Sequence, residues 1–122
     1  MKNNIPIYIQ IVDEVKRQII SKELKPGDKI NSVRELAARF GVNPNTIQKA
    51  LNELDLERII EPKKGVGNFV INDEKLINRL REEKAKEIIQ EFFFKIQGLG
   101  YEDEEIEKKI NEYFNKKGID ND

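Results

Sequence analysis

The most informative part of the chain is residues 32–47, which read SVRELAARFGVNPNTI. Ser32 is followed by glutamate three residues later, a capping box that predicts the start of a helix. Gly41 is expected to end that helix in the left-handed conformation that glycine tolerates. Asn43 then precedes a proline, and this pair is typical of the beginning of a further helix. Two short helices joined by a tight turn with glycine predict a helix-turn-helix.

The flanking segments complete a winged helix. Residues 6–21 carry isoleucine or valine at every fourth position, which predicts an amphipathic helix, and Pro-Gly within residues 24–28 predicts a turn after it. Residues 59–61 and 68–71 are β-prone runs around a basic, glycine-rich loop, which predicts a hairpin. We therefore expect a mainly α fold with a small β-hairpin, in which residues 1–72 form a winged helix-turn-helix.

The helical period returns in residues 73–122. One long helix is expected from Asp73 to the Gly-Leu-Gly segment at residues 98–100, followed by a shorter helix that contains Ile106 and Phe114. The glycines should fold the two helices into an antiparallel hairpin that serves dimerisation. We expect the last five residues, from Gly118 onward, to be frayed.

The composition excludes several classes of function. The chain has no histidine and no cysteine, so a Ser-His-Asp relay, a thiol nucleophile, a Cys/His zinc site and a disulfide framework are all ruled out. We expect no enzyme activity, no cofactor and no metal. No apolar run approaches about 18 residues and no signal-peptide core follows the polar start, so we expect a cytoplasmic chain without a membrane partner.

The charges are distributed unevenly along the chain. Residues 1–72 contain 12 basic and 9 acidic side chains, whereas residues 73–122 contain 10 and 14. A basic half joined to an acidic half is typical of a polyanion-binding module attached to another element, although a charged chain also varies by chance.

The third predicted helix and the predicted wing carry the candidate contacts with double-stranded DNA. Residues 36–52 contain no acidic side chain, and the helix should present amides, a threonine and Lys49 outward. Amide side chains can pair with an adenine edge, and Lys63 and Lys64 beside glycines can neutralise phosphates. Each feature has a plainer interpretation, an ordinary solvated helix face and a solubilising loop.

An ordered series of motifs makes a resemblance specific. The series is Pro6-x-Tyr8-x-Gln10-Ile11, Leu24-x-Pro26-Gly27-Asp28-Lys29-Ile30, Ser32-Val33-Arg34-Glu35-Leu36-Ala37, Gly41-Val42-Asn43-Pro44-Asn45-Thr46-Ile47, Ala50-x-x-x-Leu54 and Gly65-x-Gly67-x-Phe69-Val70. Over residues 5–71 the chain resembles the DNA-binding domain of the GntR family of bacterial transcription regulators. The short two-helix extension resembles the YtrA-like branch, whose small C-terminal part serves dimerisation.

The resemblance implies DNA contacts by Arg34 from the second helix, by several residues of the recognition helix, and by Lys64 and Gly65 from the wing. Taken with the outward residues, the predicted DNA-binding set is Ser32, Arg34, Asn43, Asn45, Thr46, Gln48, Lys49, Lys63, Lys64 and Gly65. The chain departs from the family pattern at four positions, which are Asn31, Pro44, Gln48 and Arg58. Arg58 replaces a usual glycine, so that turn is expected to be strained or differently shaped. Pro44 and Gln48 replace frequent arginines, so the relatives' base preferences are not carried over.

Three consecutive phenylalanines, Phe92 to Phe94, lie in the long C-terminal helix. Consecutive helical residues point about 100° apart, so these rings cannot all face one partner helix. A second copy of the chain would cover the stripe that the hairpin leaves exposed, and the predicted dimerisation residues are Ile88, Phe92, Phe93 and Ile96. The alternative is that the rings pack against the winged helix.

These observations predict a homodimeric transcription regulator, a repressor, that binds a two-fold operator. The alternative is a winged-helix module that binds a protein, and an enzyme is the third class. The acid-free recognition face and the basic wing favour DNA. The sequence leaves open whether a small-molecule effector exists.

Overall fold

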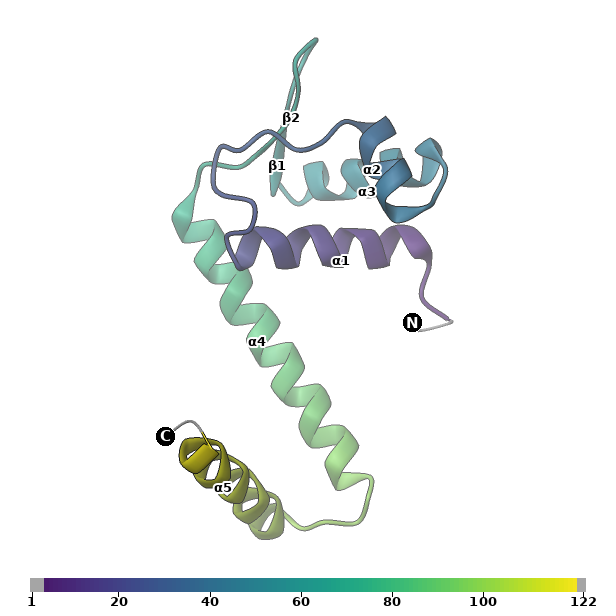
Figure 1. The fold of residues 1–122 in the computed structure, drawn as a ribbon. Coiled ribbons are helices and arrows are strands. Elements are labelled where there is room, and N and C mark those ends of the chain that lie inside the picture. The colour runs from purple at the N-terminus through teal and green to yellow at the C-terminus, as the bar shows by residue number, and fades with distance from the viewer. Residues whose placement is uncertain (1–3, 121–122) are drawn as a thin grey trace. The chain divides into compact units, whose positions relative to one another are not determined.

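The computed structural model describes residues 4–120, with side chains described through Gly118. Within these residues the chain forms five helices and two strands. In chain order they are α1 (Ile7–Ile20), α2 (Val33–Phe40), α3 (Pro44–Leu56), β1 (Ile60–Lys63), β2 (Gly67–Val70), α4 (Glu74–Gln97) and α5 (Asp103–Asp120). The observed order matches the predicted mainly α fold with a small hairpin (Figure 1).

The chain divides into two compact units between Arg81 and Glu82, inside α4. The first unit holds α1, α2, α3, the hairpin and the first turns of α4. The second unit holds the rest of α4 and α5. The sequence placed its boundary between residues 72 and 73, at the beginning of α4, and that division of roles stays a prediction.

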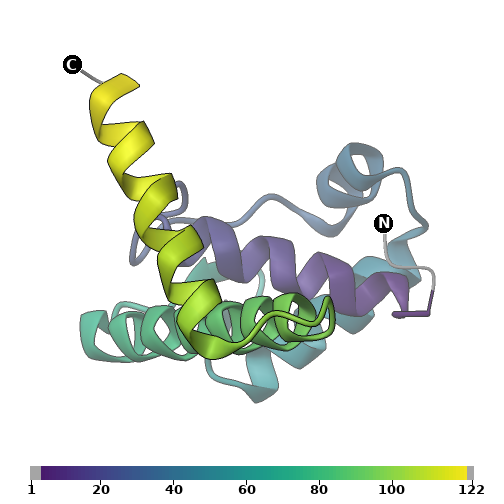
Figure 2. The ribbon, with the colours of Figure 1, turned by 90° about the horizontal axis from the view of Figure 1, so that it is seen from below.

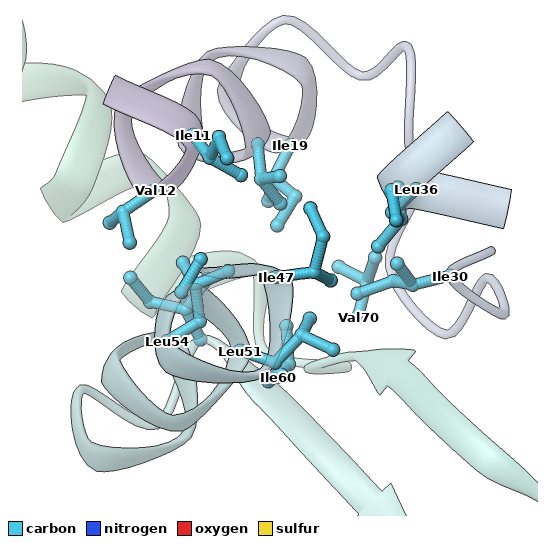
Figure 3. Close-up of a cluster of buried hydrophobic side chains, with 14 of the residues drawn as sticks. Ile11, Val12, Ile19, Ile30, Leu36, Ile47, Leu51, Leu54, Ile60 and Val70 are labelled. Atoms are coloured by element: carbon cyan, nitrogen blue, oxygen red, sulfur yellow. The ribbon is translucent and has the colours of Figure 1, made fainter. Parts of the chain in front are cut away.

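The core of the first unit is built from one apolar stripe of each element. Helix α1 contributes Ile11, Val15 and Ile19, and α3 contributes Ile47 and Leu54, all at most 5% exposed. Side chains from α1, α2, α3, both strands and the segment before α2 converge on this cluster (Figure 3). Because each stripe recurs at helical spacing, the polar faces of α2 and α3 are left toward solvent.

The helix ends form as the local sequence predicts. Ser32 and Glu35 make both hydrogen bonds of the capping box at the start of α2. Gly41 ends α2 with φ of 67°, in the left-handed region that costs glycine little. Asn43 caps α3, and proline occupies its first turn. These predictions are confirmed.

Strand β1 is longer than the sequence indicated, since Pro62 and Lys63 belong to it and not to the loop. Pro62 pairs with Asn68 in the antiparallel ladder. The N–H of Ile71 donates to the oxygen of Ile59 at 3.0 Å, so alternate residues of β1 bond across to β2 and Pro62 falls between them. Its missing N–H therefore costs the ladder nothing, which explains why the prediction of a loop at this proline was wrong.

The segment before α2 covers the other edge of β2. The N–H of Val70 donates to the oxygen of Asp28, and the N–H of Ile30 donates to the oxygen of Asn68, each at 2.8 Å. Lys29 thereby lies opposite Phe69 in an isolated antiparallel bridge. The sequence predicted only a turn in residues 24–28 and did not indicate this third, strand-like segment.

The first turns of α4 are attached to the first unit. Asp73 accepts a hydrogen bond from the N–H of Leu76 at 3.1 Å, which caps the start of the helix. Ile77 is fully buried in the core. The Nη2 atom of Arg81 donates to the backbone oxygen of Ile20 at 2.8 Å and so satisfies a free carbonyl at the end of α1.

The second unit has very little interior. Ile106 is the only fully buried side chain among its described residues. The chain reverses direction at Gly98–Gly100, and α5 then diverges from α4 (Figure 2). The expected fraying from Gly118 is wrong for residues 118–120, which are helical, because a single glycine weakens a helix by only about 1 kcal/mol relative to alanine. Residues 121 and 122 lie outside the described residues.

Candidate nucleic-acid interface

The N-terminus of α3 is closed by the side chain of Asn43. Its Oδ1 atom accepts from the backbone N–H of Thr46 at 2.9 Å and from the Thr46 hydroxyl at 3.2 Å. The amide oxygen of Asn43 and the hydroxyl hydrogen of Thr46 are thus engaged inside the cap. What these two residues can offer to DNA is the amino group of Asn43, and the methyl group and hydroxyl oxygen of Thr46.

The middle of α3 carries two further ordered contacts on its exposed face. The Nε2 atom of Gln48 donates to Oδ1 of Asn52 at 2.9 Å, one helical turn further along. The ammonium group of Lys49 lies 5.0 Å from the centre of the Tyr8 ring of α1. Asn45, in the first turn of α3, is also exposed.

The start of α2 adds a cation and a hydroxyl. The N–H of Ser32 donates to Oε1 of Glu35 at 2.9 Å, and the N–H of Glu35 donates to Oγ of Ser32 at 3.1 Å. The hydrogen bond from the Ser32 N–H holds the pKa of Glu35 below its usual value. The Ser32 side chain also hydrogen-bonds the Glu35 carboxylate and lowers the same pKa further. Arg34 is exposed and makes no ion pair with any described residue.

The wing tip is a tight turn with cations around it. The N–H of Val66 donates to the oxygen of Lys63 at 2.9 Å, and Gly65 in this turn has φ of 76°. A positive φ at the third residue of a turn is the signature of type II and favours glycine. The ammonium group of Lys63 lies 4.4 Å from the centre of the Phe69 ring, and Lys64 is exposed.

Lys29 is a further cation of the wing that the sequence did not single out. A Cβ atom added at Gly67 would lie 3.0 Å from Cε of Lys29, so the lysine stem crosses closely over this glycine. Lys29 also lies opposite Phe69, on the face of the hairpin that carries Lys63. Its place depends on pairing between residues 28–30 and β2, which no local pattern reveals.

The predicted DNA-binding residues therefore all belong to the first unit and to three of its elements, the α2 N-terminus, α3 and the hairpin. The hairpin projects past α3 on the side away from α1 (Figure 1). Lysine and arginine side chains are the cations here, and α2 and α3 have no acid from Leu36 to Asn52. Such a surface can neutralise phosphates and present amides to base edges.

The second unit presents an open apolar groove between α4 and α5. Its volume is about 630 Å³, and the predicted dimerisation residues Phe92, Phe93 and Ile96 line it. Ile88 is exposed but is not part of the lining. The sequence had not assigned the opposite wall, where α5 contributes Tyr113 and Phe114.

The third phenylalanine, Phe94, is separate from the groove. It is 79% exposed and does not line the groove. Around α4 it is turned by about 100° from Phe93 and about 160° from Phe92. The prediction that three adjacent rings cannot share one partner helix agrees with this arrangement.

Residues 7–70 match the family described as "Bacterial regulatory proteins, gntR family". This match spans more than half of the chain. The chain belongs to the GntR family of bacterial regulatory proteins. Its first unit is the winged helix-turn-helix DNA-binding domain of that family, as the motif series indicated.

Two curated relatives extend the match. The uncharacterized HTH-type transcriptional regulator YhcF of Bacillus subtilis is 36% identical over 108 residues, which cover 88% of this chain and 89% of YhcF. The HTH-type transcriptional repressor YtrA of Bacillus subtilis is 43% identical over 74 residues, which cover 61% of this chain and 57% of YtrA. The resemblance to the YtrA-like branch is confirmed.

Two solved structures are similar to this GntR-family chain. A GntR family transcriptional regulator from Listeria monocytogenes has a TM-score of 0.83 and 35% identity, over 92% of this chain and 98% of that one. The DNA-binding domain of AraR in complex with operator ORR3 has a TM-score of 0.54 and 31% identity, over 57% of this chain and 84% of that one.

The protein is thus a DNA-binding transcription regulator by family, and the relatives named above carry the names of regulators and not of enzymes. Among the described residues, no group of three or more Asp and Glu side chains gathers as a metal site requires. None of the helices in residues 4–120 combines the length and the apolar character that crossing a bilayer requires.

Proposed function

We propose that the protein is a repressor that binds a two-fold operator as a homodimer. The observation that carries the proposal is the acid-free stretch from Leu36 to Asn52, across α2 and α3, beside a wing with three lysines. One structural relative is an AraR DNA-binding domain in complex with an operator, and one curated relative is named as a repressor. Two recognition helices of a dimer would enter successive major grooves of the operator.

The predicted DNA-binding residues divide into two roles. Asn45, Thr46 and Gln48 project from the first turns of α3, where side chains can reach base edges in the major groove. The cations, the polar side chains at the two helix starts and the wing backbone are placed for phosphates, which fix register without reading sequence. These are Ser32, Arg34, Asn43, Lys49, Lys63, Lys64 and Gly65. Lys29 joins this second set on the geometry of the wing.

The small interior of the second unit supports the homodimer. Its described residues bury one side chain completely, yet Phe92 is 41%, Phe114 62% and Tyr113 64% exposed. Exposed apolar surface of this kind is typical of an interaction site. A two-fold axis places the same surface of both copies in contact, so the aromatic wall of each α5 can fill the groove of the other copy.

A salt titration of the full chain tests the proposal. Duplexes are first selected from a randomised double-stranded library, and affinity is then measured by fluorescence anisotropy at several salt concentrations. We expect a palindromic consensus and a log–log salt slope of about −0.9 for each phosphate contact. Affinity that does not respond to salt, or no enriched sequence, would contradict DNA binding. A consensus without two-fold symmetry would contradict the dimer.

A further inference from the structure

The exposed face of α3 contains a hydrogen-bonded pair of side chains, of which only Gln48 is in the predicted DNA-binding set. Its partner is Asn52. Gln48 and Asn52 stand four residues apart, so they occupy one helix face on successive turns. The Nε2 atom of Gln48 donates to Oδ1 of Asn52 at 2.9 Å. Both side chains are exposed, and neither makes another hydrogen bond with a described residue.

The bond leaves Gln48 with the groups that adenine recognition needs. A glutamine amide carries two N–H groups and one carbonyl oxygen. An adenine edge in the major groove offers an acceptor at N7 and a donor at N6, and a glutamine matches both with one N–H and its oxygen. The second N–H is then surplus to base recognition, and Asn52 accepts one N–H of Gln48 in this structure.

Neighbouring side chains of α3 are engaged differently. The amide oxygen of Asn43 lies inside the helix cap, and Lys49 lies against the Tyr8 ring. In the predicted base-reading set, Gln48 differs because its amide donates to a second amide side chain, Asn52, on the same helix. A side chain held in one rotamer before binding loses less conformational freedom when it binds.

We propose that Asn52 is a positioning residue that holds Gln48 for an A·T base pair, with the Gln48 amide on the N6 and N7 atoms of adenine. The inference rests on the proposed function. A guanine at the same place would put its O6 acceptor against the Gln48 oxygen, so the pair selects against G·C. Asn52 itself acts through Gln48 and touches no base.

The test measures base preference position by position with the full chain. Four variants are compared with the wild type on a randomised duplex library, Gln48→Ala, Asn52→Ala, Asn52→Asp and the double alanine variant. Gln48→Ala should reduce preference for A·T at one position of each half-site by about 5- to 150-fold. Asn52→Ala should reduce preference at that same position by about 2- to 12-fold, the usual net effect of one hydrogen bond.

Asn52→Asp is the matched control, because it keeps the Oδ1 acceptor and adds a negative charge. It should retain the A·T preference while binding all sequences more weakly. In the double variant the two losses should not multiply, since the Asn52 effect passes through Gln48. A thermal melt of each variant confirms folding, because both side chains are exposed and their truncation should leave Tm nearly unchanged.

Several outcomes would overturn the inference while leaving the proposed function intact. These are an unchanged preference in Asn52→Ala, a loss at a different base pair, a multiplicative double variant, or a preference for G·C at the Gln48 position. If the wild type enriches no duplex at all, the proposed function itself fails. The two failures are therefore distinguishable.

Discussion

The two units of this chain differ most in what they bury. The first unit encloses a cluster of 15 buried apolar residues that all its elements share, whereas the described part of the second unit buries only Ile106 completely. The DNA-binding unit can therefore be stabilised by its own core, and the helical unit cannot hide its aromatic side chains by itself. In the proposed homodimer, a second copy would therefore complete the second unit, and it would not be needed to fold the first.

The largest effect is expected from charge placed in the groove of the second unit. We expect Phe92→Asp with Phe93→Asp to abolish the dimer, because two buried carboxylates cost several kcal/mol, on the order of 3–5. The winged helix should stay folded and bind the operator far more weakly, since a monomer contacts only one half-site of the operator. Analytical ultracentrifugation and far-UV circular dichroism measure the two effects.

Phe94→Asp is the matched control for that experiment. It adds the same charge to the same helix on a side chain that is 79% exposed and does not line the groove. It should leave the dimer intact. If Phe94→Asp dissociates the dimer and the groove variant does not, the interface lies on the other face of α4. If the groove variant unfolds entirely, these rings belong to a core of the monomer.

A second test asks whether charge acts in the first unit alone. Lys63→Ala with Lys64→Ala should weaken binding to all sequences alike and reduce the salt slope by about two at most. Lys116→Ala with Lys117→Ala removes the same charge from the exposed end of α5 and should leave the slope unchanged. Anisotropy titrations at several salt concentrations give both slopes. Equal effects of the two variants would show that only net charge matters.

A third, smaller effect concerns the turn after α3. Arg58 has φ of 62°, in the left-handed region that disfavours side chains with a Cβ atom, as expected from its replacement of a usual glycine. Arg58→Gly should raise the free energy of unfolding by about 1 kcal/mol. Arg58→Ala keeps the unfavourable φ and should give no such gain. Urea denaturation followed by circular dichroism distinguishes them, and equal stability of all three would mean that the turn carries no strain.

The smallest expected effect is a pH dependence at the capping box. Hydrogen bonding from the Ser32 N–H lowers the pKa of Glu35 in the folded state, so its stabilising contribution is complete above its unfolded pKa of about 4.5. The contribution is lost as the pH falls through the lower, folded value. Glu35→Gln keeps an acceptor but does not titrate, so its Tm should fall less between pH 5 and about pH 3.

The fall of Tm at acid pH is not expected to vanish in Glu35→Gln. The pKa values of Glu14 and Glu23 are also lowered, mainly by hydrogen bonds from Arg17, and they titrate in the same range. If Tm falls equally with pH in the wild type and in Glu35→Gln, the result would contradict a role of Glu35 in the cap.

The features that sequence predicted are those encoded within a few residues. The Ser32 cap, the αL glycine at residue 41, the Asn43 cap and the apolar stripes depend on neighbours in the chain, so their spacing reveals them. The strained turn at Arg58 was expected for the same reason. The roles assigned to individual DNA-binding and dimerisation residues stay predictions, because contacts with DNA or a second copy decide them.

The features that sequence missed depend on residues brought together by folding. Lys29 reaches the wing only because residues 28–30 pair with β2, some 40 positions further along. The α5 wall of the groove follows from how two helices diverge after Gly100. The bond between Gln48 and Asn52 depends on side-chain rotamers, which helical spacing permits but does not specify.

The proline in β1 has a consequence for how the protein behaves at high concentration. A projecting two-stranded hairpin is a hazard, because a free strand edge offers backbone groups to the edge of another molecule. Here one edge of β2 is occupied by residues 28–30, and the outward edge of β1 carries Pro62, which has no N–H to offer. The wing can therefore extend toward DNA without recruiting a strand from a neighbouring molecule.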